Sequence, residues 1–256
     1  MCLVVFANNV HKNYKLIFAA NRDEFYNRPT EQAEFWNNYP DLLAGKDLQA
    51  GGTWMGITKQ GRFVAITNFR DLRNFKENAP SRGKLTLDFL VNEIGPEEYY
   101  KSLKSTLNDY NGFNLLLGNI NELYYFSNKN YGLKKLEPEI YGLSNALLDT
   151  PWPKVAKSKS YLKKIIDQQE IHPWEVLNIL SDTMLAKDEE LPDTRVGLEL
   201  ERLLSPVFTR MEKYGTRCST IVMVDKNDNV KFVEKSYFAN AGNFSTKEYN
   251  FTINKK

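Results

Sequence analysis

The second residue of the chain is the clearest candidate for chemistry. The sequence begins Met1-Cys2. Because an initiator methionine is removed when the next side chain is small, we expect the mature chain to start at Cys2. Its thiol would then stand beside an α-amine whose pKa of about 7.7–8.0 allows it to accept the thiol proton at neutral pH. The pair is a nucleophile with its own base. A small apolar residue at the start of a strand is the alternative interpretation.

Charged and amide side chains follow a strand that we expect to lie beside Cys2. Residues 3–8 and 15–20 are short apolar, β-rich runs joined by a polar segment, which predicts a hairpin. The second run leads directly into Asn21, Arg22, Asp23 and Glu24. An amide, a guanidinium and a carboxylate could therefore all reach the nucleophile. The alternative is a polar loop held by an ion pair from Arg22 to an adjacent acid.

Two further asparagines end short apolar runs. Residues 51–58 and 62–68 predict a second hairpin that ends on Asn68, and residues 141–145 end on Asn145. A side-chain NH2 at a strand end can donate to a developing oxyanion, as acyl transfer requires. Gly51 and Gly52 would allow backbone or ligand to approach closely. Local hydrogen bonding at a turn is the alternative role for each asparagine.

Arg217 and Cys218 begin a hairpin near the end of the chain. Its predicted strands cover 218–224 and 230–238. Adjacent strand residues face opposite ways, so if Arg217 points into a site, Cys218 points away from it. We therefore do not expect Cys218 to pair with Cys2.

The remaining segments supply the frame. Residues 25–50 read as a surface loop with one short strand near 42–44, and residues 187–199 as an acidic connection that is a lid, a disordered loop or a plain linker. The other predicted elements are a third hairpin at 113–118 and 122–127, a weaker strand at 133–136, and helices at 84–93, 97–108, 154–168 and 173–186.

Composition narrows the class of protein. The 256 residues, 42% hydrophobic and 13% aromatic, can bury the core of one domain, which we expect to span residues 1–256. A net charge of +2, from 34 basic and 32 acidic residues, argues against a nucleic-acid partner. The sequence contains no run of 18 apolar residues, so we do not expect membrane insertion. Two distant cysteines, with only His11 and His172, predict no disulfide framework and no metal site, and we expect a cytoplasmic protein.

The ordered motifs of the chain resemble a known family over nearly its whole length. The chain is similar to the transport and Golgi organization protein 2 family, also called the NRDE family. The motifs that carry the resemblance are Met1-Cys2, Ala19-Ala20-Asn21-Arg22-Asp23-Glu24-Phe25-Tyr26-Asn27-Arg28-Pro29, Gly51-Gly52-Thr53-Trp54-Met55-Gly56, Asn68, Ser144-Asn145, Pro151-Trp152-Pro153-Lys154 and Gly215-Thr216-Arg217.

That family is in turn similar to N-terminal nucleophile (Ntn) hydrolases of the choloylglycine hydrolase kind. The resemblance implies an α+β fold, a four-layer αββα sandwich. It also implies Cys2 as nucleophile, Asp23 as the acid that orients the α-amine, Asn68 and Asn145 as oxyanion and substrate-positioning amides, and Arg217 as support for the thiolate. Ala20 departs from the pattern, since those hydrolases carry an arginine there and this chain has Arg22 instead.

Two functions follow as hypotheses. The first is an amidohydrolase that cleaves a linear, non-peptide amide without a cofactor, with Asn21, Arg22, Trp54 and Arg70 as substrate-binding residues. The second is a non-catalytic carrier or chaperone for haem, lipid or acyl-CoA, since relatives are associated with such cargo. A haem carrier would need an axial ligand such as Cys2, His11 or His172.

Overall fold

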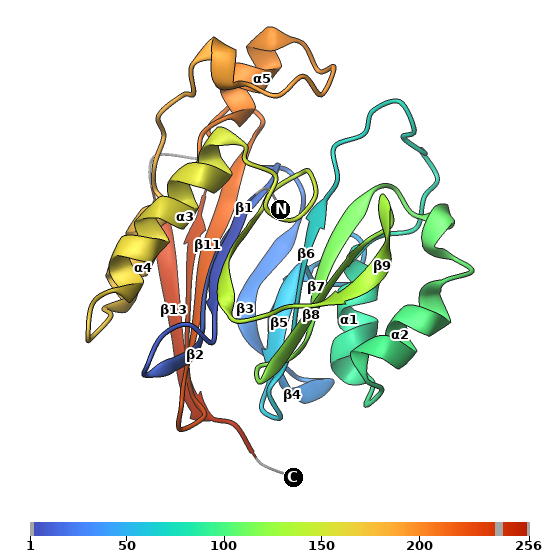
Figure 1. Cartoon of the computed structure of the whole chain (residues 1–256). Coiled ribbons are helices and arrows are strands. Elements are labelled where there is room, and N and C mark those ends of the chain that lie inside the picture. The colour runs from blue at the N-terminus through green and yellow to red at the C-terminus, as the bar shows by residue number, and fades with distance from the viewer. Residues whose placement is uncertain (1–2, 239–242, 255–256) are drawn as a thin grey trace.

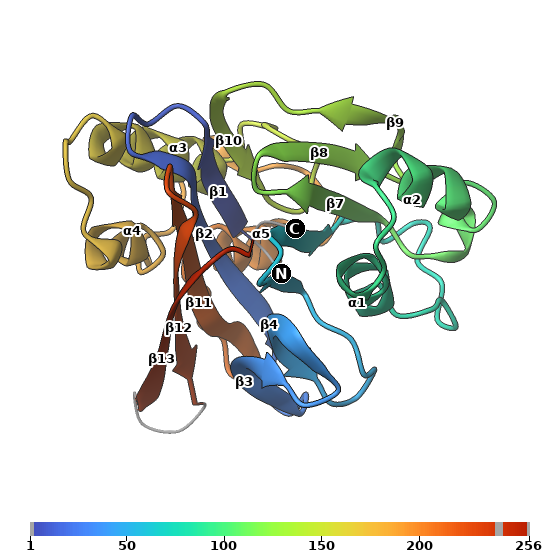
Figure 2. The ribbon, with the colours of Figure 1, turned by 90° about the horizontal axis from the view of Figure 1, so that it is seen from below.

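The structure, a computed structural model, describes residues 3–238 and 243–254. Two antiparallel β-sheets pack face to face, and helices cover the outer face of each sheet (Figures 1 and 2). This is the predicted four-layer αββα sandwich. Cys2 lies outside the described residues.

The first sheet has six strands in the order β10-β1-β2-β11-β12-β13. Its centre is β2 with β11, a long pair, so the two ends of the chain meet in one sheet. The strands are β1 (Leu3–Asn8), β2 (Tyr14–Phe25), β10 (Glu139–Leu143), β11 (Tyr214–Asp225), β12 (Asn229–Tyr237) and β13 (Phe244–Thr252).

The second sheet has seven strands in the order of the chain. Each strand therefore pairs with its sequence neighbour, as a meander of hairpins does. The strands are β3 (Thr30–Trp36), β4 (Tyr39–Asp47), β5 (Met55–Thr58), β6 (Arg62–Asn68), β7 (Phe113–Asn119), β8 (Glu122–Ser127) and β9 (Asn130–Lys135).

Helices form the outer layers. Helices α3 (Pro153–Ile166) and α4 (Pro173–Ile179) cover the six-stranded sheet, and α1 (Gly83–Val91) covers the seven-stranded sheet with α2 (Pro96–Leu103) beside it. Two 3-10 turns, Leu107–Asp109 and Asp188–Glu190, and the short α5 (Leu198–Leu204) complete the described elements. No helix in the described part of the chain is long and apolar enough to cross a membrane.

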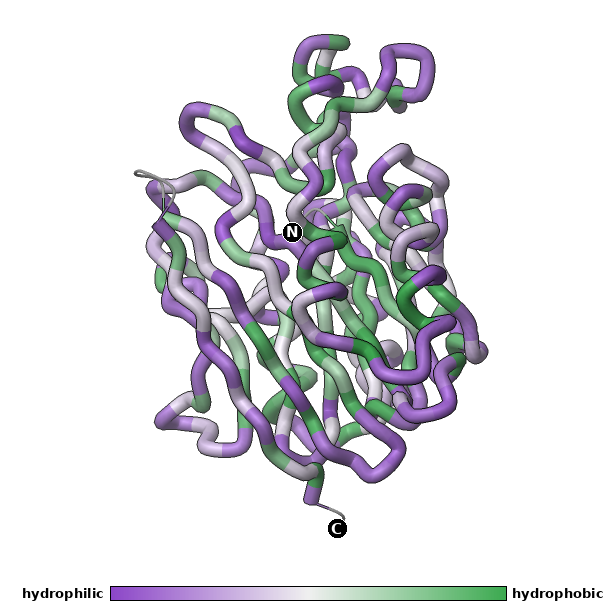
Figure 3. Tube along the Cα trace, turned by 90° about the vertical axis from the view of Figure 1, so that its left-hand side faces the viewer, coloured by the Kyte–Doolittle hydropathy of each residue, from purple (hydrophilic) through white to green (hydrophobic). Residues whose placement is uncertain are grey.

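Strand alternation builds two hydrophobic cores from one sheet. In β1, Val4 and Phe6 face the other sheet, whereas Leu3 and Val5 face α3 and α4. The sheets interlock through aromatic contacts such as Phe18 with Phe63, whose ring centroids are 4.9 Å apart. Along the chain, hydrophobic stretches run inside the sandwich and hydrophilic residues gather at many of the turns (Figure 3).

The structure confirms the four predicted hairpins and corrects several other elements. Residues 25–50, predicted as a loop with one short strand near 42–44, form the hairpin of β3 and β4. The predicted strand is part of β4, where Leu42, Leu43 and Ala44 are buried in succession, and β3, which contributes the buried Ala33, was not predicted. The helix predicted at 173–186 ends at Ile179. Within 187–199, the predicted mobile connection contains a 3-10 turn and leads into α5, and neither α5 nor β13 was predicted.

Candidate active site

The start of β1 lies beside the end of β2. Leu3, the first described residue, pairs with Asn21. The side chains that follow alternate across the sheet, so the predicted cluster is divided between its two faces. Asn21 and Asp23 face the helices, whereas Arg22 faces the seven-stranded sheet.

Asn21 anchors the outer layer to the sheet. It is completely buried, and its Nδ2 donates to the carbonyls of Leu180 at 2.9 Å and Val207 at 2.8 Å. Its Oδ1 accepts from Ser219 Oγ at 2.6 Å. These bonds leave no face of Asn21 toward a cavity, so its geometry fits an anchor rather than the substrate-binding residue that we predicted.

Asp23 is buried on the same face. Its carboxylate accepts hydrogen bonds from the hydroxyls of Thr216, at 2.6 Å, and Thr209, at 3.3 Å. Thr216 Oγ1 also accepts from the backbone N–H of Thr209, at 3.0 Å, which ties β11 to the preceding loop. The orienting role predicted for Asp23 concerns the α-amine, which lies outside the described residues and stays a prediction.

Arg22 and Trp54 form a buried pair between the sheets. The guanidinium carbon of Arg22 lies 4.2 Å from the centroid of the Trp54 ring, a cation–π contact. Arg22 Nη1 donates to Thr30 Oγ1 at 3.2 Å. The structure thus brings together two of the predicted substrate-binding residues.

Arg217 and Cys218 line the same small cavity as that pair, so the prediction that Cys218 faces away was wrong. The reason is a β-bulge: Thr216 pairs with Asp23 and Cys218 with Arg22, and Arg217 is the extra residue between them. Arg217 Nη1 donates to the carbonyl of Phe25 at 2.8 Å. Alternation resumes only after the bulge.

This small cavity, of about 40 Å3, holds a buried acid as well as the two arginines. Glu234 accepts from the backbone N–H of Ala33 at 2.8 Å, and burial raises the pKa of its carboxyl. Burial, reinforced by Glu234, also raises the pKa of Cys218 well above its ordinary value. Burial and the neighbouring Arg22 lower the pKa of Arg217. Cys218 is therefore held as a neutral, unreactive thiol.

A larger, mainly apolar cavity contains three of the predicted site residues: Asn68, Asn145 and Arg70. Its volume is about 350 Å3. It lies at the end of the molecule where β6 ends, and α5 contributes Leu200 and Leu204 to it (Figure 1). The other lining residues are Phe25, Phe69, Asp71, Leu72, Phe75, Arg82, Asn111, Gly112, Met211 and Tyr214.

The two asparagines of the cavity contact each other. Asn145 Nδ2 donates to the backbone carbonyl of Asn68 at 2.9 Å, and the carbonyl of Asn145 accepts from the N–H of Arg70 at 2.8 Å. The side-chain amide of Asn68 makes no hydrogen bond within residues 3–238 and 243–254. It is half-buried at the cavity, and is therefore a donor held in place through its own backbone.

Arg70 is held by an acid of α5. Its Nη1 lies 2.8 Å from Glu201 Oε2; Glu201 is buried and Arg70 is largely buried. The guanidinium also lies over the ring of Trp152, 5.1 Å from its centroid. Glu201 accepts from the N–H of Thr194 as well, at 2.8 Å. Arg70 therefore joins α5 to the floor of the cavity.

Sequence reasoning missed Arg82, Glu201 and Glu234. Arg82 stands in a polar loop before a helix, Glu201 in a helix too short to show a period, and Glu234 at an inward position of a strand. The one available signal was Glu234, a charge among the apolar residues of a predicted strand.

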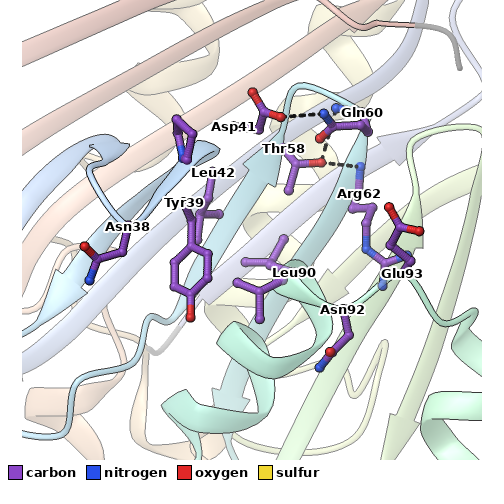
Figure 4. A pocket seen from close by; sticks show the side chains of 12 residues that line it. Asn38, Tyr39, Asp41, Leu42, Thr58, Gln60, Arg62, Leu90, Asn92 and Glu93 are labelled. Carbon is purple, nitrogen blue, oxygen red and sulfur yellow. Dashed lines mark hydrogen bonds between the residues drawn. The ribbon is translucent and has the colours of Figure 1, made fainter.

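A third cavity, of about 670 Å3, lies away from these residues, between the turn of β3 and β4 and the end of α1 (Figure 4). Several of its polar side chains are engaged with protein groups. Gln60 Nε2 donates to Asp41 at 2.7 Å, and Arg62 Nη2 donates to the carbonyls of Phe89 and Ile94 at 2.6 and 2.9 Å. It contains none of the predicted site residues.

Comparison with known proteins decides the family. The model of the transport and Golgi organisation 2 family matches residues 1–239. The chain belongs to this family. It is 36% identical to the mouse transport and Golgi organization 2 homolog and 35% identical to the human homolog, with 99% of this chain and of each relative covered.

A solved structure agrees with the fold of this family member. The chain is similar to a mutant of the conjugated bile acid hydrolase of Clostridium perfringens, with a TM-score of 0.52, 10% identity, and 99% of this chain and 97% of that chain covered. At this identity the likeness concerns the fold, which is the Ntn-hydrolase sandwich predicted from the sequence.

Proposed function

We propose that the protein is an amidohydrolase that cleaves a linear, non-peptide amide with Cys2 as its nucleophile. The observation that carries the proposal is the side-chain amide of Asn68, which is uncommitted within the described residues and lines an apolar cavity. The Ntn-hydrolase fold and the Met1-Cys2 start support it. Leu3, the residue after Cys2, pairs with Asn21 on the strand that carries Arg22.

The reaction follows from the groups present. The α-amine of Cys2 takes the thiol proton, and the sulfur forms a bond to the carbonyl carbon of the amide while the electron pair moves to oxygen. Asn68 Nδ2 donates to that oxyanion. When the carbonyl re-forms, the C–N bond breaks and the leaving amine receives the proton. Water then cleaves the thioester, which releases the acid and restores the thiol.

The other residues have supporting roles in this proposal. Asn145 positions Asn68 through the backbone carbonyl of that residue. Arg22 and Arg217 place positive charge on the inner side of the β2 and β11 pair, where it would favour a thiolate over a thiol. Contact of Asn145 with the oxyanion stays a prediction, as does a substrate contact by Trp54.

The test is a screen of linear N-acyl amides against the chain with a free Cys2 terminus, with amine release followed by mass spectrometry. We expect Asn68→Ala to lower kcat by about 10²–10³, with a smaller change in KM, since one oxyanion donor contributes that much. Asn92→Ala, an exposed asparagine after α1, is the matched control. An unchanged kcat in Asn68→Ala would remove the proposed role, and loss of activity in Asn92→Ala would show a general defect.

The cavity also supports a second candidate, a carrier, because its lining is mainly apolar and Leu72 and Phe75 at its edge are exposed. A lipid or acyl-CoA would suit such a surface. For haem, neither histidine lines this cavity, and His11 is engaged through Nε2 with the carbonyl of Gln168 at 3.0 Å. Titration with haem that produces no Soret shift at micromolar concentration would argue against a haem carrier.

A further inference from the structure

Arg82 is a cation of the apolar cavity that the proposed mechanism does not use. Its Nη1 donates to the backbone carbonyl of Gly112 at 2.9 Å. Within residues 3–238 and 243–254 it forms no ion pair with a carboxylate. A guanidinium has five N–H donors and stays charged in proteins. Arg82 therefore presents charge and donors to a largely apolar space.

The other charges of the cavity are balanced by protein groups. Arg70 is paired with Glu201 at 2.8 Å, and Asp71 is paired with Lys129 at 2.7 Å. Each pair contributes no net charge, so Arg82 leaves the lining with a net positive charge.

Residues around the cavity do not remove this charge. Burial lowers the pKa of Arg82, with Glu24 opposing and Arg28 reinforcing that shift. Glu24 lies 3.9 Å from Arg28, whose guanidinium also pairs with Asp47 at 2.7 Å, and Glu24 forms no ion pair with Arg82 in the described part of the chain. The desolvation of Arg82 is therefore offset only in part by its protein neighbours, and an anionic ligand would compensate for it.

The apolar residues of the lining indicate that the rest of such a ligand is apolar. Phe69, Leu72, Leu200 and Met211 are apolar, and the volume of about 350 Å3 is at the small end of the range for ligand pockets, about 300–1,000 Å3. A compact apolar group fits this space, whereas a large polar ligand would leave polar atoms unsatisfied.

We propose that Arg82 is the specificity residue of the cavity and binds the carboxylate of an anionic amphiphile, whose short apolar chain occupies the space among Phe69, Leu72 and Leu200. This inference rests on the proposed function only where it names the substrate class of the amidohydrolase, an N-acyl amide that carries a carboxylate. Binding itself does not require the nucleophile.

The experiment compares two ligands that differ in charge. N-octanoylglycine carries a carboxylate where N-octanoylethanolamine carries a hydroxyl, and both contain the same acyl amide. Calorimetric titration of the full chain with Cys2→Ala measures binding without turnover. We expect the carboxylate ligand to bind more tightly, with an affinity that falls as salt is added.

Substitution of Arg82 identifies the residue. Arg82→Gln should weaken the carboxylate ligand about 10- to 100-fold, as expected for a hydrogen bond to a charged group, and leave the neutral ligand unchanged. Arg82→Lys keeps the charge but lacks the planar guanidinium, so its affinity for the carboxylate ligand should lie between those of the natural residue and Arg82→Gln. Arg73→Gln, an exposed arginine of the same loop, is the matched control and should change neither ligand.

The neutral ligand reports on the integrity of the cavity. Equal weakening of both ligands by Arg82→Gln would assign Arg82 a structural role and overturn the inference. Equal binding of the two ligands to the chain with Arg82 intact, or binding of neither, would also overturn it. If the charge preference is found and the chain with free Cys2 releases no amine from either ligand, the binding site stands and the proposed function fails.

Discussion

At the scale of single residues, the charged side chains around the two cavities are stabilised in several ways. Arg70 is paired with an acid, Arg22 is stacked on Trp54, and Asp23 is held by two hydroxyls. Glu234 accepts neutral hydrogen bonds from Ala33 N–H and the Ser236 and Thr220 hydroxyls. Because these bonds replace water incompletely, burial raises the pKa of Glu234.

This shift predicts a pH dependence of stability. A carboxyl with a raised folded-state pKa binds more protons in the folded than in the unfolded chain, so the free energy of unfolding falls as pH rises. The fall begins near the ordinary value of 4.5 and ends above the raised folded value. Glu234→Gln keeps an acceptor for Ala33 and should remove this component, so the stability of the variant relative to the natural chain should increase as pH rises above 4.5.

Urea denaturation at several pH values measures the effect. Glu248→Gln, on the exposed side of β13, is the control and should leave the pH profile unchanged. A difference between Glu234→Gln and the natural chain that stays constant with pH would contradict the assignment.

The sequence could predict which residue types gather but not which face each one takes. The alternation of Asn21, Arg22 and Asp23 was available from the strand pattern, yet we expected all of them to serve one site. The bulge at Arg217 could not be read from the sequence, because it depends on the register with β2.

At the scale of elements, the ion pair of Glu201 with Arg70 attaches α5 to the cavity. Glu201→Gln leaves Arg70 charged and without its acid, which should cost about 3–5 kcal/mol if the segment stayed closed. We expect α5 to detach instead, with faster amide hydrogen exchange in residues 194–204 and little change in the central strands.

A second ion pair on the same segment provides the control. Arg202 and Asp188 are paired on the surface, where both side chains are exposed. Asp188→Asn should leave exchange in α5 nearly unchanged, because exposed pairs contribute little. Similar acceleration in both variants would show that α5 responds to any loss of charge and would contradict the anchoring role of Glu201.

Alanine substitutions at the adjacent Gly51 and Gly52 should destabilise the fold for different reasons, one conformational and one steric. A Cβ on Gly52 would lie 2.4 Å from the backbone of Gly83, whereas a Cβ on Gly51 meets nothing within 4 Å, although Gly51 has a φ of 75°. Gly51→Ala should cost about 1–2 kcal/mol, from backbone conformation alone. Gly52→Ala should cost more, since backbone must move. Thermal denaturation that ranks them in the opposite order would contradict this close approach.

Hairpins could be predicted because each joins neighbours in sequence through a polar turn. Of the β3–β4 hairpin only the short strand near 42–44 was predicted, because the polar and turn-forming residues around it resemble a loop. The strand β13 is exposed at alternate positions and was not predicted from its composition. Its backbone pairing with β12 holds it in the sheet.

At the scale of the whole molecule, residues of β2 and β11 line both the apolar cavity and the small cavity. Phe25 and Tyr214 line the apolar cavity, and Arg22 and Arg217, farther along the same strands, line the small one. The family and the layers followed from motifs spread over the chain. The positions of α5 and Arg82 did not, because they depend on contacts between segments far apart in sequence.

The most direct test of the central claim concerns Cys2 itself. The intact mass of protein purified from its native cell should be measured before and after brief treatment with a thiol alkylator at neutral pH. The account predicts loss of Met1 and rapid labelling of one cysteine, assigned to Cys2 by peptide mapping, while the buried Cys218 stays unlabelled. Retained Met1, or a Cys2 that reacts no faster than an ordinary thiol, would contradict an activated N-terminal nucleophile.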